Sequence, residues 1–139
     1  MIFPYTEYTL VDGTKISRPT LPVCFKFGRT EIPIAEALVD TGADQTLLPL
    51  AFASEFGFKF DLVEDKIEWQ GAGGHSFPVY KSPEAIELCI NMKGFRRKYW
   101  KAKVYFTLQQ PTVLLGHKGF LEHFDLTFRG AKKALEVNI

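Results

Sequence analysis

Residues 37–49 read ALVDTGADQTLLP. An apolar strand runs straight into an acid, a hydroxyl and a glycine, Asp40, Thr41 and Gly42, and the chain then returns to apolar residues. An aspartate at the end of a buried strand is costly unless it is paired, hydrogen-bonded or used in chemistry. Gly42 allows a tight turn with its N–H near the carboxylate, and the Thr41 hydroxyl can lock the loop. The stretch therefore marks Asp40 as a candidate catalytic acid.

The same three residue types also favour ordinary turns, so the tripeptide alone is compatible with a plain connection between strands. Two further segments favour the functional interpretation. Residues 69–75, WQGAGGH, predict a hairpin with a glycine-rich tip, and residues 110–121, QPTVLLGHKGFL, form an apolar run that ends in glycine. Glycines lower the cost of the backbone excursions that a moving flap needs. Taken alone, the first of these segments is equally compatible with an ordinary long hairpin.

Many short strands with two brief helices predict an all-β fold, built as a closed or orthogonally packed barrel. The expected strands and hairpins alternate apolar and polar residues or flank turns: 23–27, 32–39, the hairpin 65–80, 84–92, about 96–107 after a turn at Gly94, and the terminal hairpin 126–137. The expected helices cover residues 50–56 and 116–124.

Composition is that of an ordinary globular chain: 139 residues, 46% hydrophobic, with a formal charge of +1. This length suits one domain. We expect residues 22–139 to form its core and residues 1–21 to be an N-terminal extension of the same domain. The balanced charge gives no reason to expect a nucleic acid or a membrane as partner. The basic stretch 96–103 fits a strand with a solvated face, with Trp100 pointing inward and Arg97 and Lys101 toward water.

No apolar run approaches the roughly 20 residues that span a bilayer, and the first residues lack a basic leader with an apolar core. We therefore expect a cytoplasmic protein, in which Cys24 and Cys89 are reduced, passive thiols. No spacing of His and Cys suggests a metal site, so neither metal nor cofactor is expected. His75 and His117 lie near the hairpin tip and the second glycine segment, and the sequence assigns neither a role.

In the order of these segments the chain resembles the retropepsins, the single-domain aspartic proteases typified by retroviral enzymes. The resemblance runs from about Val23 to Phe128 and is strongest at residues 36–48, where family members also read Glu-Ala-Leu, an apolar residue and Asp-Thr-Gly-Ala-Asp. It implies the closed acid-protease barrel, with one or two short helices and a flap hairpin.

The resemblance also implies roles residue by residue. Asp40 is the catalytic acid, Thr41 braces the paired loops across a two-fold axis, and Gly42 accepts the substrate backbone. Ala43 and Asp44 line the cleft. The remaining roles go to the flap tip and to the segment that packs beneath the loop: Gly71, Ala72, Gly73 and Gly74 in the flap, and Leu114, Leu115 and Gly116 beneath the loop.

The motif occurs once, and peptide hydrolysis by this chemistry needs two carboxylates that share one proton. The short chain therefore predicts a homodimer in which each subunit supplies one Asp40 to an endopeptidase acting on peptides or proteins. The monomer should be inactive. A dimer that only binds peptides on the same fold is the alternative. Asp40, Thr41 and Gly42 could also form the phosphate-binding hairpin of an actin-like ATPase. That fold needs two large domains, so the length of this chain disfavours it.

One position departs from the family pattern. Many retropepsins carry Gly-Arg where this chain has Gly116 and His117, and their arginine is thought to pair with the acid at the position of Asp44. A neutral His117 predicts weaker support for that acid, and hence a less rigid loop or a weaker dimer.

Overall fold

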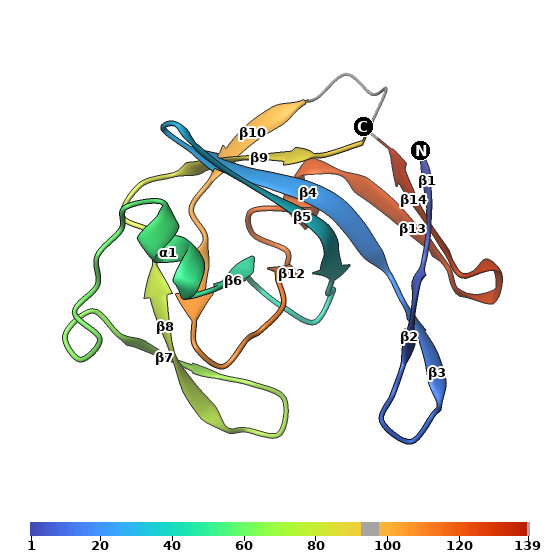
Figure 1. The fold of residues 1–139 in the computed structure, drawn as a ribbon, viewed down its shortest axis with the longest axis horizontal. Coiled ribbons are helices and arrows are strands. Elements are labelled where there is room, and N and C mark those ends of the chain that lie inside the picture. Colours follow the sequence, from blue (N-terminus) through green and yellow to red (C-terminus); the bar gives the residue numbers. More distant parts are fainter. Residues whose placement is uncertain (93–97, 139) are drawn as a thin grey trace.

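The computed structural model describes residues 1–92 and 98–138. It is built almost wholly of strands (Figure 1). The strands are β1 (Ile2–Pro4), β2 (Thr6–Thr9), β3 (Lys15–Arg18), β4 (Thr20–Phe27), β5 (Thr30–Val39), β6 (Leu47–Pro49), β7 (Ile67–Gln70), β8 (Ser76–Lys81), β9 (Ile86–Ile90), β10 (Tyr99–Ala102), β11 (Tyr105–Thr107), β12 (Leu114–Leu115), β13 (Asp125–Arg129) and β14 (Ala134–Asn138). The helical elements are α1 (Ala51–Glu55) and the 3-10 turns η1 (Leu121–His123) and η2 (Gly130–Lys132).

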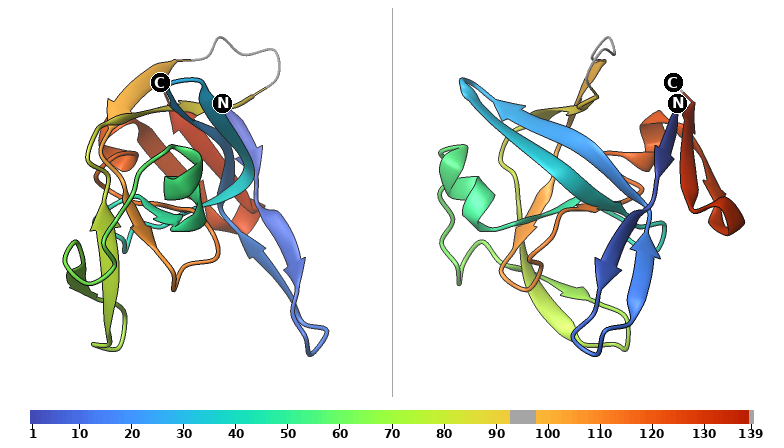
Figure 2. Two further views of the ribbon diagram at one scale, coloured as in Figure 1. Left: turned by 60° about the vertical axis from the view of Figure 1, so that its left-hand side comes forward. Right: turned by 45° about the vertical axis from the view of Figure 1, so that its right-hand side comes forward.

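Nine strands form one sheet in the order β10-β9-β4-β5-β12-β6-β11-β8-β7. The sheet curls into a half-barrel, which Figure 2 shows from two further directions. Its concave side holds an apolar core in which Phe25, Phe106 and Phe120 are fully buried. The all-β expectation is confirmed. The chain has 13 phenylalanines, and several of them serve this core, because large rings fill the space inside a strongly curved sheet.

The order of β5, β12 and β6 positions the candidate site. β12 lies between the other two strands, parallel to β5 and antiparallel to β6. Residues 40–46 must therefore leave the end of β5, pass over the end of β12 and return as β6. This crossover lifts the Asp40 loop out of the sheet, with the β12 backbone directly beside it.

The N-terminal residues divide between two small sheets. β1 pairs with β14, which pairs with β13, and Phe3 from β1 is buried with Leu135 and Val137. β2 and β3 form a separate hairpin. It projects from the same side of the molecule as the hairpin of β7 and β8 (Figures 1 and 2). The Tyr8 hydroxyl ties the β2–β3 hairpin to β5 by donating to Glu36 Oε2 over 2.7 Å.

Two expectations about secondary structure are wrong in extent. The single strand expected from about residue 96 to 107 is two strands, because β10 pairs with β9 whereas β11 pairs with β6 and β8. Ser82 lies at the break: its hydroxyl accepts the Val104 N–H, and its own N–H donates to the Val104 carbonyl. The turn expected at Gly94 and the outward Arg97 fall outside the described residues. Trp100 is half-buried and Lys101 exposed, as expected.

The helix expected over residues 116–124 is only the 3-10 turn η1. Gly119 breaks it, since its φ of +89° is not helical and its N–H donates to the Glu122 carboxylate. By contrast, the first expected helix is present as α1, and Gly57 ends it with a φ of +81°.

Cys24 and Cys89, distant in sequence, are cross-strand neighbours on β4 and β9 and are not joined by a disulfide. Among the described residues, no helix is long and apolar enough to cross a membrane.

Candidate active site

Backbone hydrogen bonds to the β12 segment hold Asp40 in place. The Leu38 N–H donates to the Val113 carbonyl over 2.9 Å, and the Asp40 N–H donates to the Leu115 carbonyl over 3.0 Å. The β5–β12 ladder thus continues to Asp40 itself. The loop's first residue is therefore positioned by a sheet rather than by a flexible connection.

The Asp40 carboxylate folds back on its own loop. Its Oδ1 accepts the Gly42 N–H over 2.9 Å, and the Asp40 carbonyl accepts the Ala43 N–H over 3.2 Å. A Cβ built on Gly42 would lie 3.2 Å from the same Oδ1, so a side chain there would crowd the carboxylate. Gly42 therefore supplies the N–H that binds the Asp40 carboxylate, and its lack of a side chain leaves room for the carboxylate to approach. Asp40 is half-buried, whereas Thr41 and Gly42 are exposed.

The segment after β12 supports the loop from the other side. The N–H groups of His117 and Lys118 donate to the carbonyls of Ala43 and Asp44, each over 2.9 Å. A Cβ on Gly116 would lie 2.2 Å from the Gln45 carbonyl oxygen. Only glycine fits at this contact. Leu114, Leu115 and Gly116 thus lie beside the Asp40 loop, where the sequence places them.

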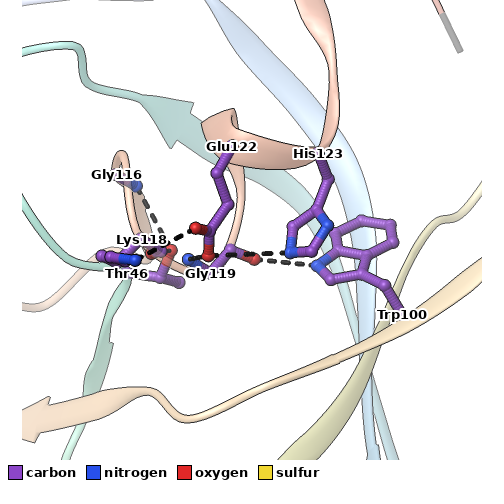
Figure 3. A network of polar contacts seen from close by, with 7 residues as sticks. All are labelled: Thr46, Trp100, Gly116, Lys118, Gly119, Glu122 and His123. Atoms are coloured by element: carbon purple, nitrogen blue, oxygen red, sulfur yellow. Dashed lines mark hydrogen bonds and ion pairs between the residues drawn. The ribbon is translucent and has the colours of Figure 1, made fainter.

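Thr46 joins the two segments at the base of the loop. Its side chain is fully buried; the hydroxyl accepts the Gly116 N–H over 3.3 Å and donates to the Lys118 carbonyl over 2.9 Å. Further along, the Glu122 carboxylate accepts the Gly119 N–H over 2.9 Å (Figure 3). This bond is the main reason that the pKa of Glu122 lies below its ordinary range, with a smaller contribution from Lys118.

The Trp100 indole N–H donates to the Gly119 carbonyl over 2.8 Å, which closes the network drawn in Figure 3. Both backbone groups of Gly119 are therefore bound by side chains, one from Glu122 and one from β10. The segment that supports the loop is in this way fixed to the wall of the half-barrel.

His117 does not occupy the role that the resemblance suggests for the basic residue at its position. Its Nε2 lies 2.7 Å from the carbonyl oxygen of Thr41, and no bond to the Asp44 carboxylate is found among the described residues. A carbonyl only accepts hydrogen bonds, so Nε2 carries the proton. No local pattern in the sequence indicates this contact, because it joins two loops that are 76 residues apart.

The β7–β8 hairpin faces the loop across an open cleft of about 950 Å³. Residues 71–75 form its tip, closed by the Gly71 N–H donating to the His75 carbonyl over 2.9 Å. Gly73 and Gly74 adopt φ of +88° and +79°, which explains the glycines there. Trp69 packs on Tyr105 with ring centroids 4.4 Å apart. Trp69 and Phe77 are half-buried and line the cleft.

Six of the residues named from the sequence as site residues in the loop and flap line the cleft: Asp40, Gly42, Ala43, Asp44, Gly71 and Ala72. Leu114 also reaches it, whereas Thr41, Gly73, Gly74, Leu115 and Gly116 are not part of its lining. Sequence reasoning missed a polar wall: Gln45, Glu68, Gln70, Thr107, Gln109 and Gln110. Of these residues, Glu68 and Gln70 alternate on β7, and that spacing could have indicated a shared face.

Electrostatically the cleft is acidic. Asp40, Asp44 and Glu68 line it, and none of its described lining residues is basic. Lys66 contacts Glu68 at 3.4 Å and offsets part of that charge. Among the described residues, no cluster of His, Cys, Asp and Glu could hold a metal ion.

No family model and no curated protein matches the chain by sequence. Solved structures do. A retropepsin-like aspartic protease from Rickettsia conorii superposes with a TM-score of 0.59 at 20% identity, covering 97% of this chain and 95% of that one. EIAV protease in complex with the inhibitor HBY-793 gives 0.45 at 23% identity, covering 72% and 82%. The retroviral protease-like domain of Ddi1 from Leishmania major gives 0.49 at 16% identity, covering 86% and 89%.

The Rickettsia structure carries the comparison, because it covers nearly the whole of both chains. The chain has a retropepsin-like fold. At this level of identity the likeness concerns the fold, and the function must be argued from the site.

Proposed function

We propose that the chain is one subunit of a homodimeric aspartic endopeptidase. One observation carries the proposal: on a retropepsin-like fold, the Asp40 carboxylate is held by the Gly42 N–H at the wall of an open cleft beneath a glycine-tipped hairpin. Thr41 and Gly42 are exposed in the single chain, as expected if a second subunit covers this loop in the dimer. A two-fold axis beside Asp40 would bring two copies of the carboxylate together.

In this mechanism the paired carboxylates share one proton, because two adjacent like charges cannot both ionise cheaply. The ionised Asp40 takes a proton from a bound water, whose oxygen attacks the scissile carbonyl carbon. The protonated Asp40 of the other subunit gives its proton to the carbonyl oxygen. Collapse of the tetrahedral intermediate then breaks the C–N bond. The leaving nitrogen takes the proton that came from water, and one hydroxyl of the intermediate returns its proton to the other carboxylate, so the pair again shares one proton.

The other roles follow from position. Gly42, Ala43 and Asp44 would bind the substrate backbone, Thr41 would brace the paired loops, and residues 71–74 would close over the peptide. The contacts of residues 114–116 with the loop support a positioning role for that segment. We also propose that residues 1–21 belong to the same domain as 22–139, because Phe3 is part of the core. The cytoplasmic location stays a prediction.

The test is cleavage of a pool of unstructured peptides by the purified protein between about pH 4 and 7, with the dimer verified by sedimentation. Asp40→Asn should abolish cleavage and keep the fold. Asp65→Asn, on an exposed loop before β7, is the matched control and should cleave like the wild type. A verified dimer that binds peptides without cleaving them would instead support the peptide-binding alternative.

A further inference from the structure

The peptide group that joins Thr41 to Gly42 is hydrogen-bonded at both ends. Its carbonyl accepts from His117 Nε2 over 2.7 Å, and its N–H donates to Asp40 Oδ1 over 2.9 Å. The two groups belong to one planar, conjugated unit. His117 is therefore connected to the Asp40 carboxylate through a single peptide plane.

Such an arrangement has two physical consequences. First, a donor at the carbonyl fixes the orientation of the plane, so the Gly42 N–H keeps pointing at Asp40 Oδ1 in an otherwise exposed turn. Second, hydrogen bonds in a chain polarise one another, by about 10–30% per bond. A bond at the Thr41 carbonyl makes the Gly42 N–H a better donor. A stronger donor stabilises the negative charge that a general base must carry.

His117 is itself held on the loop. Its backbone N–H donates to the Ala43 carbonyl over 2.9 Å. The preceding residue, Gly116, packs so closely against the loop that only glycine fits at that position. Nε2 donates in the neutral ring and in the cation alike, because the second proton goes to Nδ1. The bond to Thr41 thus survives protonation, which only strengthens the donor.

The charged groups around this unit come from three elements. Asp44 lies on the loop itself, Lys118 and Glu122 lie after β12, and Glu68 lies across the cleft on β7. Lys118 Nζ is 3.4 Å from Glu122 Oε2, so these two charges partly offset each other. Among the residues that the structure describes, His117 is the basic residue whose side chain hydrogen-bonds to the Asp40 loop.

We propose that His117 is a positioning residue for Asp40, acting through the peptide group that joins Thr41 to Gly42. The inference rests on the proposed protease function insofar as it concerns catalysis. The basic residue after Gly116 then supports the catalytic carboxylate itself, in place of the acid four residues further on. This role differs from the one expected for His117 from the family pattern.

The kinetic test compares His117→Ala with His117→Gln at protein concentrations where sedimentation shows the dimer. His117→Ala should lower kcat about tenfold with little change in KM, since substrate binding is untouched. The acid limb of its pH–rate profile should move to higher pH by a few tenths of a unit. His117→Gln keeps an N–H donor and should restore most of both effects. An unchanged acid limb in His117→Ala would overturn the proposal.

A second measurement does not depend on activity. The Gly42 amide proton resonance reports on its hydrogen bond with Asp40 and should follow the ionisation of that carboxylate in an NMR pH titration. In His117→Ala the resonance should lie upfield and its midpoint at higher pH than in the wild type. Because pairing in the dimer couples the two Asp40 carboxylates, wild type and His117→Ala are compared in the same assembly state, verified by sedimentation. Identical titrations would refute the inference, whereas failure of the wild type to cleave peptides would refute only the proposed function.

Discussion

Gly116 and Gln45 are in backbone contact so close that a single methyl group could not enter between them. A Cβ on Gly116 would lie 2.2 Å from the Gln45 carbonyl oxygen and 2.7 Å from that of Ala43. Two segments about 70 residues apart in sequence thereby form one structural unit around Asp40.

Gly116→Ala should therefore be severely destabilising. Backbone atoms cannot give way as a flexible side chain can, so we expect a loss of about 3 kcal/mol or more in the free energy of unfolding. Chemical denaturation measures it. Gly130→Ala is the matched control, because nothing lies within 4 Å of a Cβ there and its φ is ordinary; its stability should change by less than about 1 kcal/mol. Equal stability of the two variants would contradict the contact.

Thr46→Val should cost about 1–2 kcal/mol, since it removes a buried hydroxyl at nearly constant shape and leaves the Gly116 N–H without its acceptor. The Lys118 carbonyl keeps the Thr46 N–H as a donor and is less affected. Thr46→Ser retains the hydroxyl and should be the more stable variant in urea unfolding. The reverse order would show that the methyl group, not the hydrogen bonds, matters.

Glu122 makes stability depend on pH. Its pKa is lowered in the folded chain, chiefly by the Gly119 N–H. A depressed folded pKa contributes stability that is present above the unfolded pKa and is lost as pH falls through the folded one. Unfolding measured from pH 6 down to 3 should therefore show a shallower loss for Glu122→Gln than for the wild type. Glu84→Gln, at another exposed carboxylate, serves as the control.

The acidic lining predicts a substrate preference. Peptides with Lys or Arg near the scissile bond should be cleaved faster than isosteric neutral ones, and the advantage should shrink between about 0.05 and 0.5 M salt as charges are screened. Glu68→Gln should reduce the preference, whereas Glu64→Gln, outside the cleft lining, should not. Equal rates for both peptide classes at low salt would show that these carboxylates do not face the substrate.

How far the sequence predicts this molecule can be judged from particular elements. The Asp40 loop and the glycine-tipped hairpin lie where the sequence predicts them, because turns and glycines depend on local backbone chemistry. The position of the Gly116 segment beside the loop was expected from the family resemblance alone. The division of residues 99–107 between two strands was missed, since Tyr99 to Thr107 alternates throughout while the chain changes partners at Val104. The alternation of apolar and polar residues indicates which face of a strand is buried, but it does not indicate which other strand pairs with it.

The contacts that complete the candidate site were not predictable for a related reason. His117 and Thr41 meet only because β12 inserts between β5 and β6. The polar cleft wall of Gln109 and Gln110 likewise belongs to a loop whose direction is set by the sheet. Residue types and the family resemblance predict a catalytic role for Asp40, which stays a prediction, whereas the groups that orient it depend on long-range topology.

The central claim is that Asp40 is half of a shared catalytic centre. The most direct measurement mixes wild-type subunits with Asp40→Asn subunits at constant total protein, allows exchange, and follows peptide cleavage. A centre built from both subunits requires activity to fall as the square of the wild-type fraction, to about one quarter at equal amounts. A linear fall, to about one half, would mean that each chain carries its own complete site and would contradict the account.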